Sequence, residues 1–453
     1  MSSAPEGAPP LGRSRGRLLK ILGLGFGLAV AIGNTIAAGI VRTPGEIASH
    51  LPAVWLFLGV WLAGGLYALL GANSLAELGT MIPRSGGQYV FARRALGPYA
   101  GFIVGWSDWI STCSTTAAVS IVVGEYTGAL VPRLAGRTVS LAVGVTLAFA
   151  LLQWRGLRWG SRTQELTAAL KTLAFVAIVA ACFVLGNGPP RASAAMAARA
   201  PAGIALAVAV ILSLQAVIYT YDGWNGVIYF SEEVRHPARD IARSMFGSVA
   251  SIAAIYLLLN AALVYVLPMR EIAGQTFALG VAAQRVFGAH GDALVRIVMI
   301  VSLLSGINAY HLMASRVLFS MSRDGLFTRY AAGVNPGGTP AAALFLSAAV
   351  AVAFILSGSF EKVIAVTAFF FVANYTMSFV SLFVLRGKEP HAPRPFRAWG
   401  YPWTPALALV GSLAFLGGAV ASDMRNSLWA LGLLAVSYPA YRLLRWLARP
   451  VSS

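Results

Sequence analysis

Hydrophobic residues in this chain gather into long runs that are nearly free of charge. An α-helix needs roughly 20 apolar residues to cross about 30 Å of hydrocarbon, and each run approaches or exceeds that length. The pattern therefore predicts an all-α integral membrane protein and argues against an aqueous globular fold. The clearest runs occupy residues 53–72, 138–153, 165–186, 203–219, 249–267, 340–357 and 362–385.

Counted from a cytoplasmic N-terminus, the pattern predicts about twelve spanning helices in one transmembrane domain, residues 21–448. Residues 1–20 form a basic tail that we expect to be disordered. The apolar run 21–41 is too long for a signal peptide and leads into further spans, so we expect it to remain as a helix. The helices are expected at roughly 22–42, 53–75, 97–131, 138–153, 161–186, 203–230, 243–267, 291–321, 340–357, 360–386, 404–421 and 427–447. Short interfacial helices are expected in the segment 268–290.

The charge of the chain fits this topology. Only 11% of the residues are charged and 58% are hydrophobic, against about 25% charged in a soluble protein. The net charge of +18 would suit a nucleic-acid partner, but about 23 Lys and Arg fall on the cytoplasmic side and about 10 outside. This asymmetry is the positive-inside pattern. It predicts a cell-membrane protein, in a bacterial inner membrane, with both termini cytoplasmic and no nucleic-acid partner.

Two spans carry polar and glycine residues at mid-membrane depth. Span 1 reads GLAVAIGNTIAAGIV and span 6 reads AVIYTYDGWNGVIYFSEEV. Glycines in membrane helices also serve close packing, but Asp222 beside Gly223 favours broken helices that line a transport site. The two spans are five apart, which predicts two inverted five-helix repeats (about 21–186 and 203–386) and two extra helices at about 404–447.

Several motifs, in order along nearly the whole chain, resemble the amino acid–polyamine–organocation superfamily. They are GNTIAAGI, ELGTMIPRSGGQYVFARRALGPYAGFIVGW, YDGWN, SEEVRHPARDIARSM, ASRVLFSMSRDG and TPAAALFLSA. Within the superfamily the chain resembles bacterial permeases related to the L-type amino acid transporters. The resemblance implies the leucine-transporter fold with discontinuous helices 1 and 6. It also implies an antiporter or facilitator of neutral L-amino acids, working by alternating access.

The resemblance also implies a substrate site at the two breaks. The substrate carboxylate is expected on backbone N–H groups of span 1 and the amine near carbonyls of span 6, with Tyr219 closing over the substrate. Ordinary aromatic packing is the alternative for Tyr219. The family usually has Gly-Ser-Gly where this chain has Ala37-Ala38-Gly39, and the added methyl of Ala37 is expected to narrow the pocket. The candidate substrate residues are Thr35, Ile36, Ala37, Ala38, Gly39, Tyr219, Thr220, Tyr221, Asp222, Gly223, Trp224 and Asn225.

Lys171 lies roughly 8–10 residues into span 5, where a lone ammonium is costly and by default marks function. Snorkelling toward the cytoplasmic interface is the alternative. By resemblance, its ammonium would take the place where sodium-coupled relatives bind sodium, near span 1 carbonyls and the hydroxyl of Ser302 or Ser305. It would act there as a fixed cation or exchange a proton. We therefore expect no sodium dependence, no metal and no cofactor.

Three further questions stay open at this stage. Asp108 in span 3 would bind a cationic group, pair with Lys171, or hydrogen-bond to Ser107 or Thr112. If Asp108 or Asp222 faces the pocket, the sequence favours a carrier of cationic amino acids or polyamines. A membrane sensor that binds an amino acid without moving it is the other alternative.

Other parts of the chain limit its partners and chemistry. Glu232, Glu233 and Asp240, among Arg235, Arg239 and Arg243, predict a salt-bridged cytoplasmic gate or brace. No Walker A motif or soluble cleft points to an ATP-driven pump or an enzyme. The loop 131–137 has no Cys, so the disulfide-linked accessory glycoprotein of animal relatives is not expected. The expected partners are the amino acid, the lipid bilayer and protons.

Overall fold

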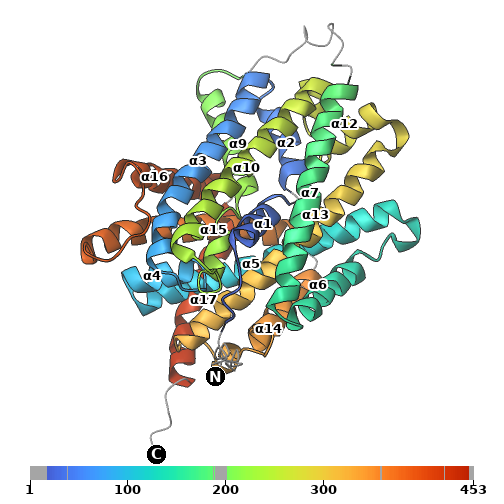
Figure 1. Ribbon diagram of the computed structural model, residues 1–453. Helices are drawn as coiled ribbons and strands as arrows, with labels where there is room; N and C mark the ends of the chain where they lie inside the picture. The colour runs from blue at the N-terminus through green and yellow to red at the C-terminus, as the bar shows by residue number, and fades with distance from the viewer. Residues whose placement is uncertain are drawn as a thin grey trace, which may run out of the picture.

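The computed structural model describes residues 18–37, 39–186, 188, 201–357, 360–422 and 424–447. Within these residues the chain is helical apart from connections and one isolated β-bridge (Figure 1). The longer helices are α3 (Val54–Met81), α5 (Pro98–Leu130), α6 (Thr138–Trp154), α7 (Leu157–Leu185), α9 (Ile204–Tyr221), α10 (Pro237–Val266), α13 (Gly291–Arg323), α14 (Ala341–Ser357), α15 (Phe360–Lys388), α16 (Trp403–Ser422) and α17 (Met424–Leu447). The shorter helices are α1 (Leu24–Thr35), α2 (Gly39–His50), α4 (Gln88–Leu96), α11 (Met269–Ile272) and α12 (Ala278–Phe287). Four short 3-10 turns complete the list: η1 (Pro132–Leu134), η2 (Gly226–Phe230), η3 (Gly288–His290) and η4 (Arg329–Ala332).

Seven helical stretches of the described chain are long and apolar enough to cross a membrane, and the bent pair α1 and α2 makes an eighth. The prediction of an all-α, multi-pass membrane protein is confirmed at this level. Helix also occupies each of the twelve predicted ranges. α5 is less apolar because it is rich in Ser and Thr, and α6 and α14 have only 17 residues each, so these three helices are not among the eight.

Some boundaries differ from the expected ones. α3 continues to Met81, beyond the predicted end at about 75, because Glu77 and other polar residues of its last turns are buried in protein rather than facing lipid. α1 begins at Leu24, and residues 18–23 before it are not helical. The amphipathic helix α4 was not predicted. The expected short helices of 268–290 are α11 and α12.

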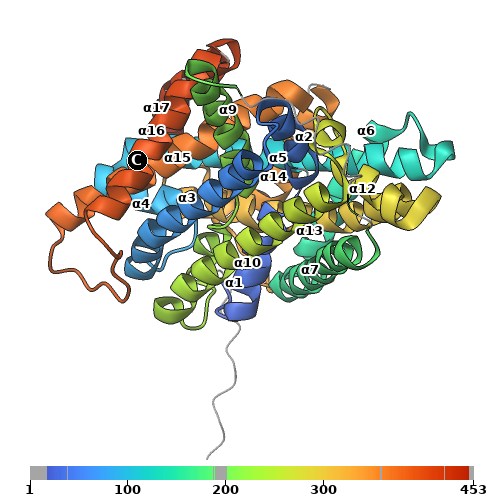
Figure 2. The ribbon, with the colours of Figure 1, turned by 90° about the horizontal axis from the view of Figure 1, so that it is seen from above.

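Helices that lie five spans apart in the predicted order pack against each other. α3 runs beside α10, as Figure 2 shows, and α5 packs along α13. α1 contacts η2, and α2 contacts α9. Helices of the second half therefore pack among those of the first. α1 contacts both α7 of the first half and α10 of the second.

A short backbone connection joins the start of the chain to the segment after η2. Leu22 donates its N–H to the carbonyl of Glu233 at 2.8 Å, and Arg235 donates to the carbonyl of Leu22 at 2.8 Å. These bonds form the β-bridge between Leu22 and Val234. The residues just before α1 are thus tied to the residues that follow the second half of span 6.

One face of the molecule collects the chain start and the ends of several helices, and we call it the N-terminal face. It comprises residues 18–23, 82–97, 231–236, 323–328 and 386–402. Ion pairs connect its parts: Arg84 to Asp324 at 2.9 Å, Arg323 to Glu232 at 2.8 Å, and Arg94 to Glu389 at 2.6 Å. α16 and α17 lie at one edge of the helical body in both views (Figures 1 and 2).

Candidate functional site

The two predicted breaks exist and touch each other. α1 ends at Thr35 and α2 starts at Gly39, with a 47° bend between them, while α9 ends at Tyr221 and η2 starts at Gly226. Gly223 has a φ of +110°, and a Cβ on it would stand 2.7 Å from Nδ2 of Asn34. Only glycine accepts both this backbone conformation and this approach. The close contact brings the unwound parts of spans 1 and 6 together.

The backbone N–H groups predicted to hold a carboxylate are not equally free. Ile36 N–H donates to the carbonyl of Ile32 at 3.1 Å, and Ala37 N–H donates to the carbonyl of Thr35 at 2.9 Å. Ala38 lies outside the described residues. Gly39 opens α2, and the first N–H groups of a helix have no partner within it. The donors available for an anion are therefore those at the start of α2.

The carbonyls at the end of α9 lie against α10. Tyr256 donates its hydroxyl to the carbonyls of Thr35 (2.9 Å) and Thr220 (3.1 Å), which joins the ends of α1 and α9. The carbonyl of Tyr219 accepts the N–H of Asp222 at 3.2 Å. Tyr256 was not predicted. Its signal is a single tyrosine in the otherwise aliphatic stretch IAAIYLLL.

Lys171 reaches the unwound end of α1. Its Nζ donates to the carbonyls of Gly33 at 2.9 Å and Ile36 at 2.8 Å. Ser302 donates its hydroxyl to the same Ile36 carbonyl at 2.7 Å. The Lys171 side chain is completely buried, so the snorkelling alternative is wrong. Among the described residues no carboxylate forms an ion pair with it, and its hydrogen bonds go to neutral backbone carbonyls.

Ser305 belongs to a neighbouring network of amides. Gln164 donates Nε2 to the Ser305 hydroxyl at 3.2 Å and to the carbonyl of Ala29 at 3.0 Å. Asn308 donates Nδ2 to Oε1 of Gln164 at 2.9 Å. Gln164 and Asn308 were not predicted, although uncharged amides inside spans are a readable signal for interhelical hydrogen bonds. This network fixes α1 to α7 and α13 beside Lys171.

Asp222 turns toward α15. Its Oδ1 accepts the hydroxyl proton of Tyr375 at 2.5 Å, and the Tyr375 ring stacks on Trp224 with a centroid separation of 5.3 Å. Asn225 is the residue that precedes η2, and Asp222 is the residue that ends α9. The carboxylate therefore links the break in span 6 to span 10.

Asp108 contacts the second half of span 6. Its Oδ1 accepts the hydroxyl proton of Tyr229 at 2.8 Å, while its Oδ2 is buried with no hydrogen-bond partner among the described residues. Ser107 instead bonds Asn374, and Thr112 donates to the backbone carbonyl of Asp108. Lys171 is bonded elsewhere, so the pairing of Asp108 with it is not formed.

The acidic segment after η2 forms a brace, though mostly with other partners than expected. Glu233 accepts two bonds from Arg316 on α13, at 3.1 and 2.9 Å, and both side chains are fully buried. Glu232 pairs with Arg323 of the same helix at 2.8 Å. Only Asp240 has a predicted partner, Arg239, at 2.8 Å. The brace therefore connects span 6 to span 8, which sequence proximity did not indicate.

The chain that carries these two breaks is similar to known proteins over most of its length. The family model for amino acid permeases matches residues 19–437. The chain belongs to the amino acid permease family. It is accordingly an amino acid transporter and not an enzyme.

Relatives within this family are similar to the permease over most of its length. The serine/threonine exchanger SteT of Bacillus subtilis is 28% identical over 94% of this chain and 96% of its own. The Asc-type amino acid transporter 1 of Mus musculus is 28% identical over 84% of this chain and 73% of its own. The human b(0,+)-type amino acid transporter 1 is 26% identical over 84% of this chain and 79% of its own.

Proposed function

We propose that this permease exchanges neutral L-amino acids across the cell membrane by alternating access and without sodium. The observation that carries the proposal is the contact between the two breaks, where helix ends of opposite polarity meet beside a buried ammonium. Relatives named as an exchanger of serine and threonine and as Asc-type and b(0,+)-type amino acid transporters support amino acids as substrate and exchange as mode.

The site proposed here binds a zwitterion through backbone groups. The start of α2, with the N–H groups of Gly39 and the two residues after it, takes the substrate carboxylate, since a helix N-terminus offers free donors and the positive end of a dipole. Carbonyls near Thr220 and Asp222 take the amine. The methyl of Ala37 narrows the pocket toward small side chains, and Tyr219 covers it from outside.

Lys171 is the proposed replacement for a sodium ion. Its ammonium bonds two carbonyls of span 1 that a cation would otherwise coordinate, and Ser302 shares one of them. Sodium then has no vacancy and no role in coupling. Loss of the Lys171 proton during the cycle is the variant that would couple transport to protons.

The proposed architecture has twelve spans, with a five-plus-five inverted repeat of the leucine-transporter type and two extra helices at about 404–447. The packing of α3 on α10 and of α5 on α13 supports it, because such repeats pair equivalent spans. Both termini are proposed to be cytoplasmic, in a bacterial inner membrane. The N-terminal face, where Arg84, Arg93, Arg94 and Arg386 lie, supports this orientation.

A second candidate function is a carrier of cationic amino acids or polyamines. The observation that favours it is the buried Oδ2 of Asp108, which has no partner among the described residues and would accept from a substrate ammonium. An Asp108→Asn variant would then lose lysine or putrescine transport selectively. Equal effects on serine and lysine would leave Asp108 with a role in packing alone.

Purified protein in liposomes tests these proposals. Vesicles loaded with unlabelled serine should take up labelled neutral amino acids much faster than empty vesicles, equally in sodium and potassium buffers. Uptake that follows a sodium gradient would overturn the role of Lys171. Uptake that follows a pH gradient would establish the proton-coupled variant. No uptake of any amino acid or amine would contradict the proposal as a whole.

A further inference from the structure

A cavity of about 400 Å³ opens on the N-terminal face, between the end of α15 and the segment that leads to α16. Its wall includes the guanidinium groups of Arg386, Arg394 and Arg397, together with Tyr401 and Phe383. No acidic side chain lines it. The transport site does not use this cavity, since its residues lie at the end of span 10 and not at the breaks.

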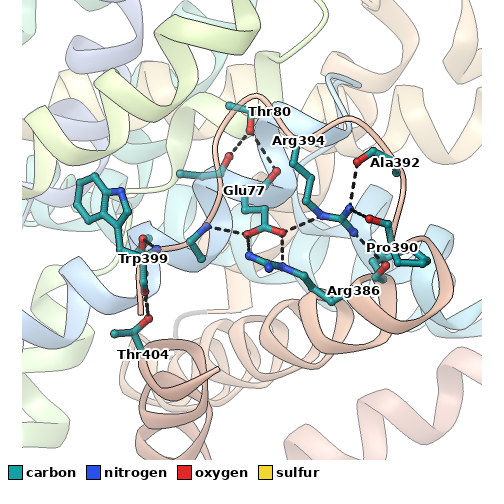
Figure 3. Close-up of polar contacts among 12 residues, drawn as sticks. Glu77, Thr80, Arg386, Pro390, Ala392, Arg394, Trp399 and Thr404 are labelled. Carbon is teal, nitrogen blue, oxygen red and sulfur yellow. Dashed lines mark hydrogen bonds and ion pairs between the residues drawn. The ribbon is translucent and has the colours of Figure 1, made fainter. Parts of the chain in front are cut away.

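Two of the three arginines, Arg386 and Arg394, are bonded to the carboxylate of Glu77, as Figure 3 shows. The buried Glu77 carboxylate accepts Nε and Nη2 of Arg386, both at 2.7 Å, Nε of Arg394 at 3.0 Å, and the N–H of Ala398 at 2.7 Å. Arg394 gives its remaining N–H groups to backbone carbonyls, including that of Ala392 at 3.0 Å. Glu77 thus sets the positions of two arginines, of the end of α15 and of the following segment.

The charges in this corner do not cancel. Three arginines line the cavity, the Glu77 carboxylate lies beside two of them, and Glu389 next to the wall is paired with Arg94, which leaves a surplus of positive charge. Nη1 of Arg386 has no partner among the described residues, and the Arg386 guanidinium lies 4.2 Å from the centre of the Tyr401 ring. Arg397 is exposed and forms no ion pair within the described part of the chain. The two free donors make the cavity suited to an anion with several oxygens.

The surroundings place the cavity at the level of lipid headgroups. Trp399 and Trp403, on either side of Tyr401, are 62% and 79% exposed. Exposed tryptophans of membrane proteins concentrate at the boundary between hydrocarbon and water. Leu407 and Val410 on α16 then expose 60% and 61% of their surface, which offers an apolar track for acyl chains beside the basic cavity. A soluble anion has no acyl chains and would not contact these apolar residues.

We propose that this cavity binds the phosphate headgroup of an anionic phospholipid. Arg397 and Nη1 of Arg386 donate to the phosphate oxygens, while the acyl chains run along Leu407 and Val410 of α16. Basic pockets between spanning helices are a recognised arrangement for anionic headgroups. Because Glu77 also binds Arg386, a bound lipid stiffens the junction of α3, α15 and the segment before α16.

The test measures lipid retention by native mass spectrometry on the purified full-length protein. Phosphatidylglycerol, phosphatidylcholine and inorganic phosphate are titrated separately. Arg397→Gln removes a donor without touching the Glu77 cluster. Arg158→Gln is the matched control, since Arg158 is exposed, lies in the first turn of α7 on the predicted cytoplasmic side, and has no side-chain partner among the described residues.

The wild-type protein should retain phosphatidylglycerol in preference to phosphatidylcholine. Arg397→Gln should weaken that retention roughly five-fold, which is the contribution of one basic residue at an anionic surface, and Arg158→Gln should leave it unchanged. Equal retention of the two lipids, or an equal loss in both variants, would overturn the proposal. Inorganic phosphate that displaces the lipid at equal concentration would identify a soluble-anion site instead. None of these readouts depends on amino acid transport.

Discussion

Lys171 and Glu77 are both fully buried ionisable side chains, yet their surroundings differ completely. Glu77 is bonded by two arginines and a backbone N–H, so its charge is more than balanced. Lys171 has two backbone carbonyls and no carboxylate partner among the described residues. A buried charge with strong partners resists any change in its position, because removing one partner costs about 3–5 kcal/mol.

The different bonding of Glu77 and Lys171 distinguishes a fixed part of the permease from a part suited to conformational change. The bonds of Glu77 join α3 to α15 and to the segment before α16, and all of them are charge-assisted or short. The bonds of Lys171 end on the unwound backbone of span 1, where carbonyls have other possible donors such as Ser302. Alternating access requires contacts that form and break at low cost, and the Lys171 site meets that requirement.

The largest effect is expected from Glu77→Ala. It leaves Arg394 and Arg386 without their carboxylate in a buried position, which should lower the free energy of unfolding by about 3–5 kcal/mol. Thermal denaturation of the detergent-purified protein, followed by size-exclusion chromatography, measures the loss. Glu46→Ala is the matched control, because Glu46 is exposed and has no ion pair among the described residues. Equal melting temperatures for Glu77→Ala and Glu46→Ala would mean that the bonds of Glu77 add no measurable stability. Glu77 would then not differ from Lys171 as a fixed site.

Lys171→Met should have the opposite profile, with a large effect on transport and a smaller one on stability. The variant keeps the volume and loses two hydrogen bonds, but it also removes the cost of burying an ionisable amine, so the net loss of stability should be below that of Glu77→Ala. We expect the exchange rate in liposomes to fall more than ten-fold. Leu170→Met, at the neighbouring lipid-facing position, serves as the control. Near-normal exchange by Lys171→Met would show that the lysine is structural, like Glu77.

Gly223→Ala tests whether the contact between the breaks matters. The variant combines a φ of +110° with a Cβ 2.7 Å from Asn34, at a cost of about 1–3 kcal/mol. Gly203 has a φ of +60° and nothing within 4 Å of its Cβ position, so Gly203→Ala carries the backbone cost alone. Exchange should fall several-fold more in Gly223→Ala than in Gly203→Ala. Equal exchange rates would mean that the two breaks work independently.

The smallest effect is expected at the exposed pair of Arg94 and Glu389. The hydrogen bond from Arg94 lowers the pKa of the Glu389 carboxyl below its ordinary value of 4.5. A lowered pKa stabilises the fold above that ordinary value, and the contribution disappears as the pH falls through the folded-state pKa. Exposed pairs contribute less than about 1 kcal/mol. Glu389→Gln should therefore lower the melting temperature slightly at pH 7, and the difference from wild type should shrink as the pH falls below 4.5; a large loss at pH 7 would class this pair with Glu77.

Hydropathy and glycine content predicted much of the fold. The breaks between Thr35 and Gly39 and between Tyr221 and Gly226 were readable because polar and glycine residues are costly at membrane depth unless they serve a site. Lys171 was readable for the same reason. What the pattern did not reveal was the extent of α3, whose last turns are polar but lie inside protein.

Long-range partners were the main omission. Tyr256, Gln164 and Asn308 connect helices far apart in sequence, and no spacing rule relates them to Thr35 or Ala29. The partners of Glu233 and Glu77 were missed likewise, because Arg316 and Arg386 lie 83 and 309 residues away. For Glu233 the sequence predicted partners among the arginines close to it in the chain, but the fold places Arg316 in contact with it instead.

The bridge between Leu22 and Val234 has a mechanical consequence for the transport cycle. Two backbone hydrogen bonds of 2.8 Å tie the entry to α1 to the exit from η2. If one half-helix tilted alone, both bonds would break, so tilting the pair as a single lever costs less. We therefore expect spans 1 and 6 to tilt together at this end of the molecule, so that a movement at either break also moves the other span.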